Sequence, residues 1–149
     1  ATYKSRIGVL EALSHCGIPC GVMVAPIIPG INNHEIPDLI EQAANAGATN
    51  AGITIVRLNG TVAQLFKDWL DKNFPDRAEK VWHQISECHG GSVSDSRPGI
   101  RMKGEGKIAE SIMQLFKLSK TKFMPTTEKF SFNSTDFNYK AGDKQLSLF

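Results

Sequence analysis

Cysteine is scarce in this chain of 149 residues: it has only Cys16, Cys20 and Cys88. An odd number of irregularly spaced cysteines does not build a disulfide framework, so we expect the reducing environment of the cytoplasm. Cys16 and Cys20 are predicted to close a helix and open a strand, where buried thiols are more typical than metal ligands. None of the four histidines has metal-ligand spacing to another histidine or cysteine, so we expect no metal site.

Long apolar runs are also missing. The longest is far shorter than the ~20 residues that a membrane-spanning helix needs, and no signal-peptide pattern is visible. Hydrophobic residues still make up 41% of the chain, which is enough for a packed core and excludes wholesale disorder. The sequence opens at Ala1, without methionine, directly into a helical pattern, so we expect it to be part of a longer protein.

The net charge of +2 indicates no particular partner, but its distribution is uneven. Residues 1–96 carry 7 basic and 10 acidic side chains, whereas residues 97–122 carry 7 basic and 2 acidic side chains. The positive charge is therefore concentrated in one segment.

The stretch from residue 20 to residue 58 predicts one parallel βαβ unit. Cys20–Pro26 is a nearly continuous apolar run, typical of a strand covered on both faces, and Pro26 is expected to end it. Asn33 is a good N-cap for the helix that follows, and Gly47 is a good terminator. Ala51–Leu58 is rich in β-branched residues and predicts the second strand.

A helix over residues 3–16 precedes this unit, which gives the order α-β-α-β of an α/β layer or barrel. Two strands alone form a poor sheet, so we expect that most of the sheet lies outside this chain. Downstream, Thr61 is a candidate helix cap. The remaining predicted segments are helices over 62–73 and 76–88, an aperiodic glycine-rich loop over 90–104, a helix over 105–123 and a flexible tail over 124–149.

Two sets of basic residues are candidate anion sites. Arg57 ends a buried-type strand, where its guanidinium can bind a carboxylate or phosphate or pair with a neighbouring helix. Arg97, Arg101 and Lys103 lie in the loop over 90–104, where they can bind phosphate or a nucleic-acid backbone. The alternative is a solvated or internally paired loop.

Several segments together resemble a known family. They are GVMVAPIIPGINNHEIPDLIEQAANAGA, a strand ending VRLNG, FKDWLDKNFPDRAEKV and SDSRPGIRMKGEG. The combination resembles the radical S-adenosylmethionine proteins related to spore photoproduct lyase, often labelled DNA repair photolyases. The resemblance covers roughly residues 3–120. It implies an α/β fold in which residues 1–60 are the last βα units of a partial (βα)6 TIM-like barrel and residues 61–123 are a helical extension.

The resemblance also implies a site. The family holds a [4Fe–4S] cluster on a Cys-x-x-x-Cys-x-x-Cys loop that this sequence lacks, so the cluster would belong to an N-terminal half of the same protein. This sequence departs from the family pattern at two places. The family often has a glycine where Pro26 or Ile28 stands. It also has an acidic residue soon after the position of Gly30, and Glu35 is only a loose equivalent of that residue. The alternative is that PIIPG is simply a rigid connection. By resemblance, the residues that contact S-adenosylmethionine are Val24, Ala25, Pro26, Ile27, Ile28, Ile55, Val56, Arg57 and Leu58.

The last five residues, QLSLF, resemble the pentapeptide by which bacterial polymerases and repair proteins bind the DNA sliding clamp. Leu146, Leu148 and Phe149 would be apolar anchors for a preformed pocket, with Gln145 at its edge. The alternative is a tail that packs on its own domain.

Two functions follow as expectations. In the first, the chain is part of a radical S-adenosylmethionine enzyme that is lyase-like and acts on nucleic acid. The chain alone would be inactive, and it would have no catalytic residue. The second is a clamp-tethered, nucleic-acid-associated binding module without chemistry.

Overall fold

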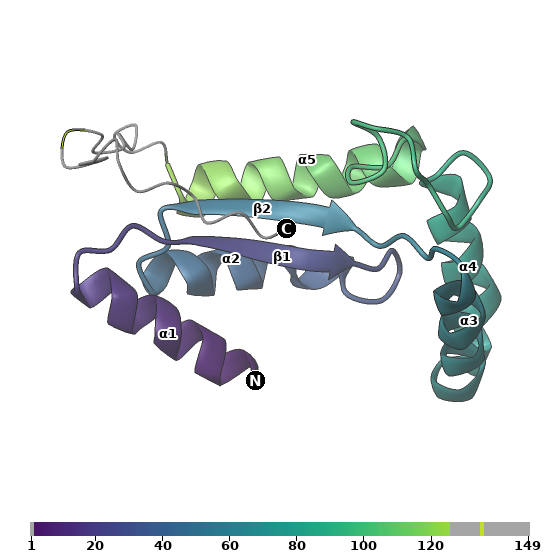
Figure 1. Cartoon of the computed structure of the whole chain (residues 1–149), viewed down its shortest axis with the longest axis horizontal. Helices are drawn as coiled ribbons and strands as arrows, with labels where there is room; N and C mark the ends of the chain where they lie inside the picture. Colours follow the sequence, from purple (N-terminus) through teal and green to yellow (C-terminus); the bar gives the residue numbers. More distant parts are fainter. Residues whose placement is uncertain (1, 126–134, 136–149) are drawn as a thin grey trace, which may run out of the picture.

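The fold is built on the predicted βαβ unit, seen in a computed structural model that describes residues 2–125 and 135 (Figure 1). Strand β1 (Gly21–Ile27) pairs in parallel with strand β2 (Asn50–Ile55). The connection between them carries the short 3-10 helix η1 (Asn33–Glu35) and helix α2 (Ile36–Asn45). The prediction of two parallel strands joined by a crossover helix is confirmed.

Strand β1 does not end at Pro26, contrary to the sequence prediction. It continues to Ile27, whose carbonyl oxygen accepts a hydrogen bond of 2.8 Å from the amide of Val56. The register shifts between Val24 and Ile27, so Pro26 falls in an irregularity of the ladder. A proline, which has no N–H group, is tolerated at such a bulge, particularly in a strand with only one neighbour.

Strand β2 ends at Ile55, three residues earlier than predicted. The amide of Ile55 donates to the carbonyl oxygen of Met102 at 3.0 Å, and that of Leu58 donates to the carbonyl oxygen of Val93 at 2.7 Å. The loop between α4 (Ala78–Glu87) and α5 (Gly106–Phe123) therefore supplies the acceptors of Ile55 and Leu58, whereas the amide of Val56 still donates to Ile27 of β1.

The remaining α-helices, α1 (Tyr3–His15) and α3 (Thr61–Asn73), agree with prediction apart from their ends. The single helix predicted over 76–88 is divided into the 3-10 helix η2 (Pro75–Arg77) and α4. Two predicted caps are wrong. Asn33 lies inside η1 and its side chain accepts from the amide of Gly30 at 2.8 Å, while Gly60, not Thr61, precedes the first residue of α3.

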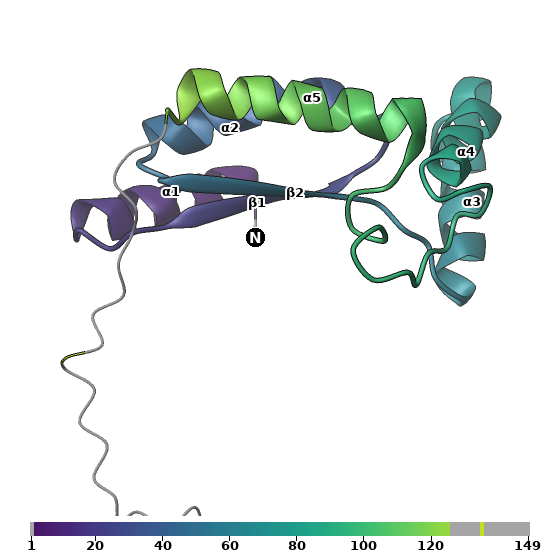
Figure 2. The ribbon, with the colours of Figure 1, turned by 90° about the horizontal axis from the view of Figure 1, so that it is seen from above.

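The helices cover the sheet unequally. Helices α2 and α5 pack together over one face, and no helix of the described residues covers the opposite face (Figure 2). Met23, which is 63% exposed, lies on the uncovered face against Gly52, beside the hydroxyl of Thr54. The strands are therefore covered on one face only within the described residues, where the sequence predicts two covered faces.

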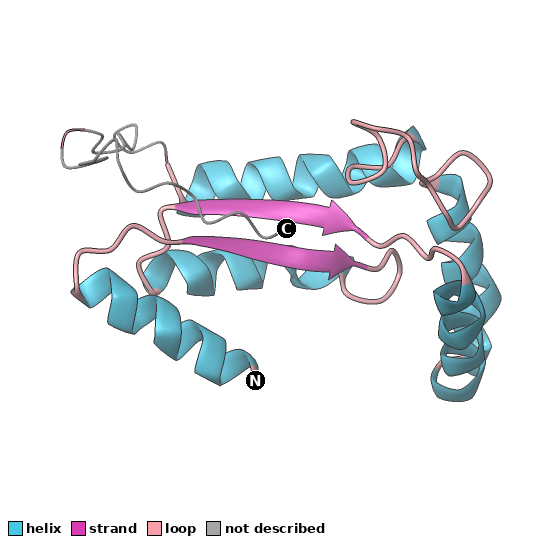
Figure 3. Cartoon of the chain, viewed as in Figure 1, coloured by secondary structure: helices cyan, strands magenta, loops and turns pink. Residues whose placement is uncertain are grey.

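Two hydrophobic cores hold these elements. The first lies between the sheet, α2 and α5 and includes Ile27, Ile40 and Ile55. The second joins the residues that follow β2, such as Leu58, to α3 and α4 at the carboxyl ends of the strands. The described residues form a mixed α/β arrangement without a closed barrel (Figure 3). None of their helices is long and apolar enough to cross a membrane.

Candidate functional site

The candidate site lies where β1 and β2 end, because ligands of parallel α/β structures bind at the carboxyl ends of the strands. Three segments meet there: the turn after β1, the residues after β2, and the loop over 88–105. Figure 1 shows α3, α4 and this loop at the end toward which both strand arrows point.

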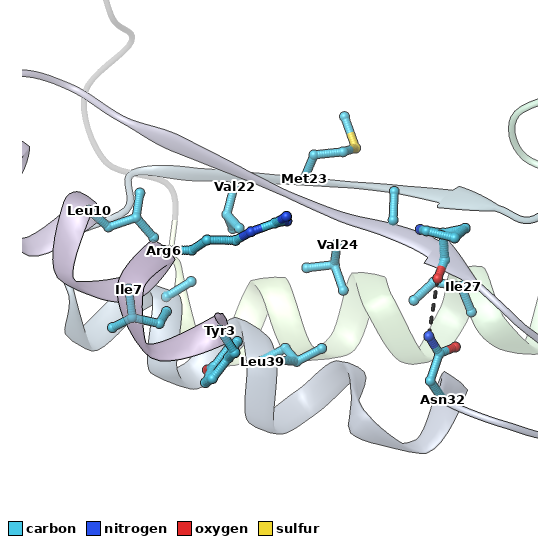
Figure 4. A pocket seen from close by; sticks show the side chains of 13 residues that line it. Tyr3, Arg6, Ile7, Leu10, Val22, Met23, Val24, Ile27, Asn32 and Leu39 are labelled. Carbon is cyan, nitrogen blue, oxygen red and sulfur yellow. Dashed lines mark hydrogen bonds between the residues drawn. The ribbon is translucent and has the colours of Figure 1, made fainter. Parts of the chain in front are cut away.

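The turn after β1 is fixed by an asparagine that the sequence analysis did not single out. The side chain of Asn32 accepts from the amide of Ile28 at 2.7 Å and donates to the carbonyl oxygen of Pro26 at 3.1 Å (Figure 4). Asn33 holds Gly30 in the same turn. A pair of asparagines after a Pro-Gly turn was the available signal, because asparagine side chains hydrogen-bond neighbouring backbone groups.

The structure divides the nine residues assigned to the cofactor into two groups. Ala25 and Pro26 are exposed, and Ile28 and Arg57 are partly exposed. A ligand at the strand ends would meet the other five mainly through their backbone, because their side chains are buried in the two cores. These are Val24, Ile27, Ile55, Val56 and Leu58.

Residues on the uncovered face of the sheet were missed as site candidates. Met23 and Thr54 point to this face, and Figure 4 shows Met23 directed away from the side where Val24 and Leu39 lie. Successive side chains of a strand point to opposite faces, so Met23 and Val24 lie on opposite faces of the sheet. This alternation was the signal that could have identified Met23 as a site candidate.

Arg57 is held at the end of β2 by the loop. Its Nη1 atom donates to the backbone carbonyl oxygen of Asp95 at 3.2 Å. The Asp95 carboxylate receives two hydrogen bonds from the guanidinium of Arg97, at 2.9 and 3.1 Å, and Arg97 also pairs with Glu105 at 2.6 Å. These bonds hold the pKa of Asp95 well below its usual range, because they stabilise the ionised carboxylate.

A buried histidine completes this network. His89 follows the last turn of α4, and its Nε2 atom lies 2.8 Å from the carbonyl oxygen of Val56. Its Nδ1 atom lies 3.4 Å from the Asp95 carboxylate. His89 has no metal-ligand spacing to another histidine or cysteine in the sequence, and no local motif indicates its partners.

The three basic residues predicted to bind an anion are not equivalent. Arg97 is engaged with Asp95 and Glu105, as the internally paired alternative expected. Arg101 and Lys103 are exposed, and no partner of their side chains is found in the described part of the chain. Within the described residues, the loop therefore offers two cations without an ion-pair partner rather than three.

A cavity of about 200 Å³ runs along the outer edge of β1 (Figure 4). Its floor and walls come from β1, α1 and α2, with Asn32 at one end. Helix α1 is tied to α2 by a hydrogen bond from the hydroxyl of Tyr3 to Gln42 at 2.6 Å, yet none of its residues is buried. Ile7, Leu10 and Leu13, the predicted core stripe of α1, are only half-buried.

The cysteines do not fit an iron–sulfur cluster. Cys16 is exposed, Cys20 is half-buried and Cys88 is buried, and burial raises the pKa of the Cys88 thiol to about 11. Within the described residues, no group of three metal-ligating side chains comes together. At the strand ends the exposed Ala25 and Pro26 lie beside backbone groups and the partly exposed Arg57, an arrangement that can contact an apolar ring and a carboxylate. The predicted clamp-binding residues lie outside the described residues.

Comparison with known proteins finds uncharacterized relatives that match half of this chain. Over 77 residues the chain is 31% identical to an uncharacterized protein of Mycobacterium bovis and, equally, to uncharacterized proteins of two Mycobacterium tuberculosis strains. The match covers 50% of this chain but only 23% of the mycobacterial proteins. No family model matches, and no solved structure matches.

Proposed function

We propose that this chain supplies the last two strands of a partial (βα)6 barrel in a radical S-adenosylmethionine enzyme related to spore photoproduct lyase. Its strand ends would form one wall of the cofactor site. The cluster would be bound by another part of the longer protein, because the cysteines of this chain do not fit it.

The open edge of β1 carries this proposal. A crossover between parallel strands is nearly always right-handed. Helix α1 contacts α2 and so lies on the same side of the sheet. Consider a further strand that precedes α1 and is joined to β1 by a right-handed crossover through α1. That strand must pair with the edge of β1 that faces away from β2. That edge is where the cavity between α1 and β1 runs.

The uncovered face of the sheet is a second support. In a barrel the face opposite the helices is the interior, where side chains from other strands pack against it. Met23 and Thr54 would then face the barrel interior. The mycobacterial relatives are also much longer than the matched segment, which leaves room in such proteins for further strands.

Within this site, the residues of the chain would bind and orient the ligand rather than react with it. The backbone at Ala25–Ile28 and Val56–Leu58 would contact the adenosyl group, and Arg57 would bind a carboxylate. S-adenosylmethionine held by these residues would supply radical chemistry, with the cluster bound elsewhere in the proposed longer protein. The Asn32 turn and the Asp95 loop would hold their parts of the wall in place.

The test is reductive cleavage of S-adenosylmethionine by the longer protein that contains this chain. The protein is loaded with iron and sulfide and incubated with dithionite, and 5′-deoxyadenosine and methionine are quantified. We expect both products from the longer protein and neither from residues 1–149 alone. A longer protein that takes up no cluster and forms no 5′-deoxyadenosine would refute the proposal.

The exposed pair Arg101 and Lys103 favours a second candidate, a nucleic-acid-associated module tethered to the sliding clamp by QLSLF. Its test is a clamp pull-down with the full chain and with a form lacking residues 145–149. Equal recovery of the two forms would reject the role of the tail. A substitution of Gln145 and Leu148 by alanine gives the same comparison without changing the length of the tail.

A further inference from the structure

We propose that the cavity between α1 and β1 receives an acidic side chain carried by a further β-strand, and that Arg6 selects this side chain. The inference rests on the proposed function for the presence of a strand beside β1. It adds the chemistry of that strand, namely one carboxylate among apolar side chains on the face toward α1 and α2.

The edge of β1 that faces away from β2 has unused hydrogen-bonding groups. Directly before β1, the carbonyl oxygen of Cys20 accepts from the amide of Thr49 at 2.8 Å, on the β2 side. Backbone groups of successive residues in a strand point to opposite sides, so those of Gly21 and Met23 point to the open edge. In the described part of the chain, no hydrogen bond links the backbone of these two residues to a segment other than β2. Such a row of unpaired N–H and C=O groups is a template for another strand.

Helix α1 is covered as incompletely as this edge. None of its residues is buried, although Ile7 and Leu10 contribute apolar side chains to the cavity. Val22, Val24 and Leu39 complete the apolar lining from β1 and α2. A strand at the edge of β1 would present every second side chain to this lining. It would therefore cover the apolar surface and the open backbone groups together, whereas a small molecule would leave the backbone groups unpaired.

Arg6 is the only charged residue in the described lining of the cavity. It is exposed, and Figure 4 shows its side chain directed from α1 toward β1. In the described part of the chain, its guanidinium has no ion pair or hydrogen bond. A strand that covers the cavity buries this charge, and a buried guanidinium without a partner is strongly unfavourable. The strand must therefore supply a carboxylate.

The position of the carboxylate follows from the sheet. Val22 and Val24 line the cavity together with Arg6, and side chains at the same level of neighbouring strands share a face. The acidic residue is therefore expected level with one of these valines, with apolar residues two positions away on either side. The peptide acetyl-Val-Thr-Glu-Thr-Val-Thr-amide has this pattern and serves as the probe.

The first experiment is an NMR titration of the full chain with this glutamate peptide and with the same peptide carrying glutamine instead. We expect the glutamate peptide to shift the amide signals of Gly21 and Met23 and to slow their hydrogen exchange. It should bind about tenfold more tightly than the glutamine peptide, because only glutamate gives Arg6 a charged acceptor. Equal affinity of the two peptides, or no shift at β1 with either, would overturn the proposal.

The second experiment repeats the titrations in Arg6→Gln and Lys4→Gln. Lys4 is an exposed cation of the same helix that does not line the cavity, so it is the matched control. We expect Arg6→Gln to remove the preference for the glutamate peptide and Lys4→Gln to keep it. A folded Arg6→Gln variant with an unchanged preference would contradict the selecting role of Arg6.

The third experiment tests strand pairing with Met23→Pro and Met23→Ala. Both variants lose the Met23 side chain, but only proline removes the N–H group that points to the open edge. We expect Met23→Pro to lose binding of the glutamate peptide and Met23→Ala to retain it. Equal binding by the two folded variants would show that the peptide does not pair with β1.

Sodium octanoate tests a free aliphatic carboxylate as the occupant. We expect octanoate neither to displace the glutamate peptide at equal concentration nor to slow hydrogen exchange at Met23. Displacement of the peptide by octanoate would make the cavity a small-molecule site and would overturn the proposal. Because neither probe needs an iron–sulfur cluster, failure of these tests is distinct from failure of S-adenosylmethionine cleavage.

Discussion

The amide of Ile55, the last residue of β2, donates to the carbonyl oxygen of Met102 at 3.0 Å. This bond joins the sheet to the loop that connects α4 and α5. Two residues beyond Met102, Gly104 packs against the side chain of Ile55 and the backbone of Cys88. The loop is therefore part of the structure around the strand ends rather than a solvated connection.

Gly104 is the residue whose substitution tests this packing. Its φ angle is +71°, and a Cβ atom there would lie 2.9 Å from the carbonyl oxygen of Cys88. We expect Gly104→Ala to lower the free energy of unfolding by about 2–4 kcal/mol, since backbone strain and overlap add. The measurement is urea denaturation.

Gly99→Ala is the matched control for this prediction. Gly99 also has a positive φ angle, +83°, but no atom lies within 4 Å of the added methyl group. We expect Gly99→Ala to lower the free energy of unfolding by about 1 kcal/mol, from backbone strain alone. Equal losses for the two variants would mean that the loop does not pack closely on β2.

The stability of the chain should fall at acidic pH because of Asp95. Hydrogen bonds from Arg97 lower its pKa in the folded state, so the folded chain binds this proton less readily than the unfolded chain. The contribution is complete above the unfolded value of about 4 and is lost progressively as the pH falls below it. Urea denaturation between pH 2 and pH 6 measures the decline.

Asp95→Asn should flatten this acid decline, because the substituted side chain does not titrate. Asp68→Asn is the control, since Asp68 pairs with Lys72 on the exposed surface of α3. We expect Asp68→Asn to retain the wild-type slope. A slope in Asp95→Asn as steep as that of the wild type would assign the decline to other groups.

The three cysteines should differ in reactivity. Cys88 is buried and its pKa is raised to about 11, so little thiolate is present at pH 8. Cys16 is exposed. We expect iodoacetamide at pH 8 to modify Cys16 at least tenfold faster than Cys88, as followed by peptide mass spectrometry. Equal rates in the folded chain would contradict the burial of Cys88.

The basic loop makes a prediction for nucleic-acid binding. We expect Arg101→Ala with Lys103→Ala to weaken binding of single-stranded DNA about tenfold and to make its salt dependence shallower by about 1.5 in log–log slope. Lys72→Ala with Lys80→Ala removes the same charge from α3 and α4 and should have little effect. Equal weakening by both pairs would indicate only a net-charge effect.

Arg97→Ala should behave differently from that pair. Because Arg97 bridges Asp95 and Glu105, its loss should lower the melting temperature of the chain. Arg101→Ala and Lys103→Ala should leave the melting temperature nearly unchanged, since both side chains are exposed.

The sequence was sufficient for the elements built from local patterns. Apolar runs and helical periodicity predicted β1, β2 and the α-helices over 3–123, but not the 3-10 helices η1 and η2. The predicted ends of the strands were wrong because residues far along the chain determine where the strands end. Ile55 and Leu58 find their acceptors in Met102 and Val93, about 40 residues away, and no local pattern encodes this pairing.

The candidate site could likewise be predicted from the sequence only in part. The exposure of Ala25 and the partial exposure of Arg57 follow from their placement at the strand ends. The burial of Val24 and Ile55 on the helix side follows from a strand's alternation, but the choice of covered face depends on α2 and α5. The network of His89, Asp95 and Glu105 is a tertiary arrangement that no short motif indicates.

We propose that the ends of β1 and β2 form a wall of an S-adenosylmethionine site. Ultraviolet cross-linking of radiolabelled S-adenosylmethionine to the proposed longer protein, followed by mapping of the labelled peptides, tests this placement. We expect label within residues 21–29 or 54–59, and its loss in competition with unlabelled cofactor. Specific label only outside residues 1–149 would contradict it.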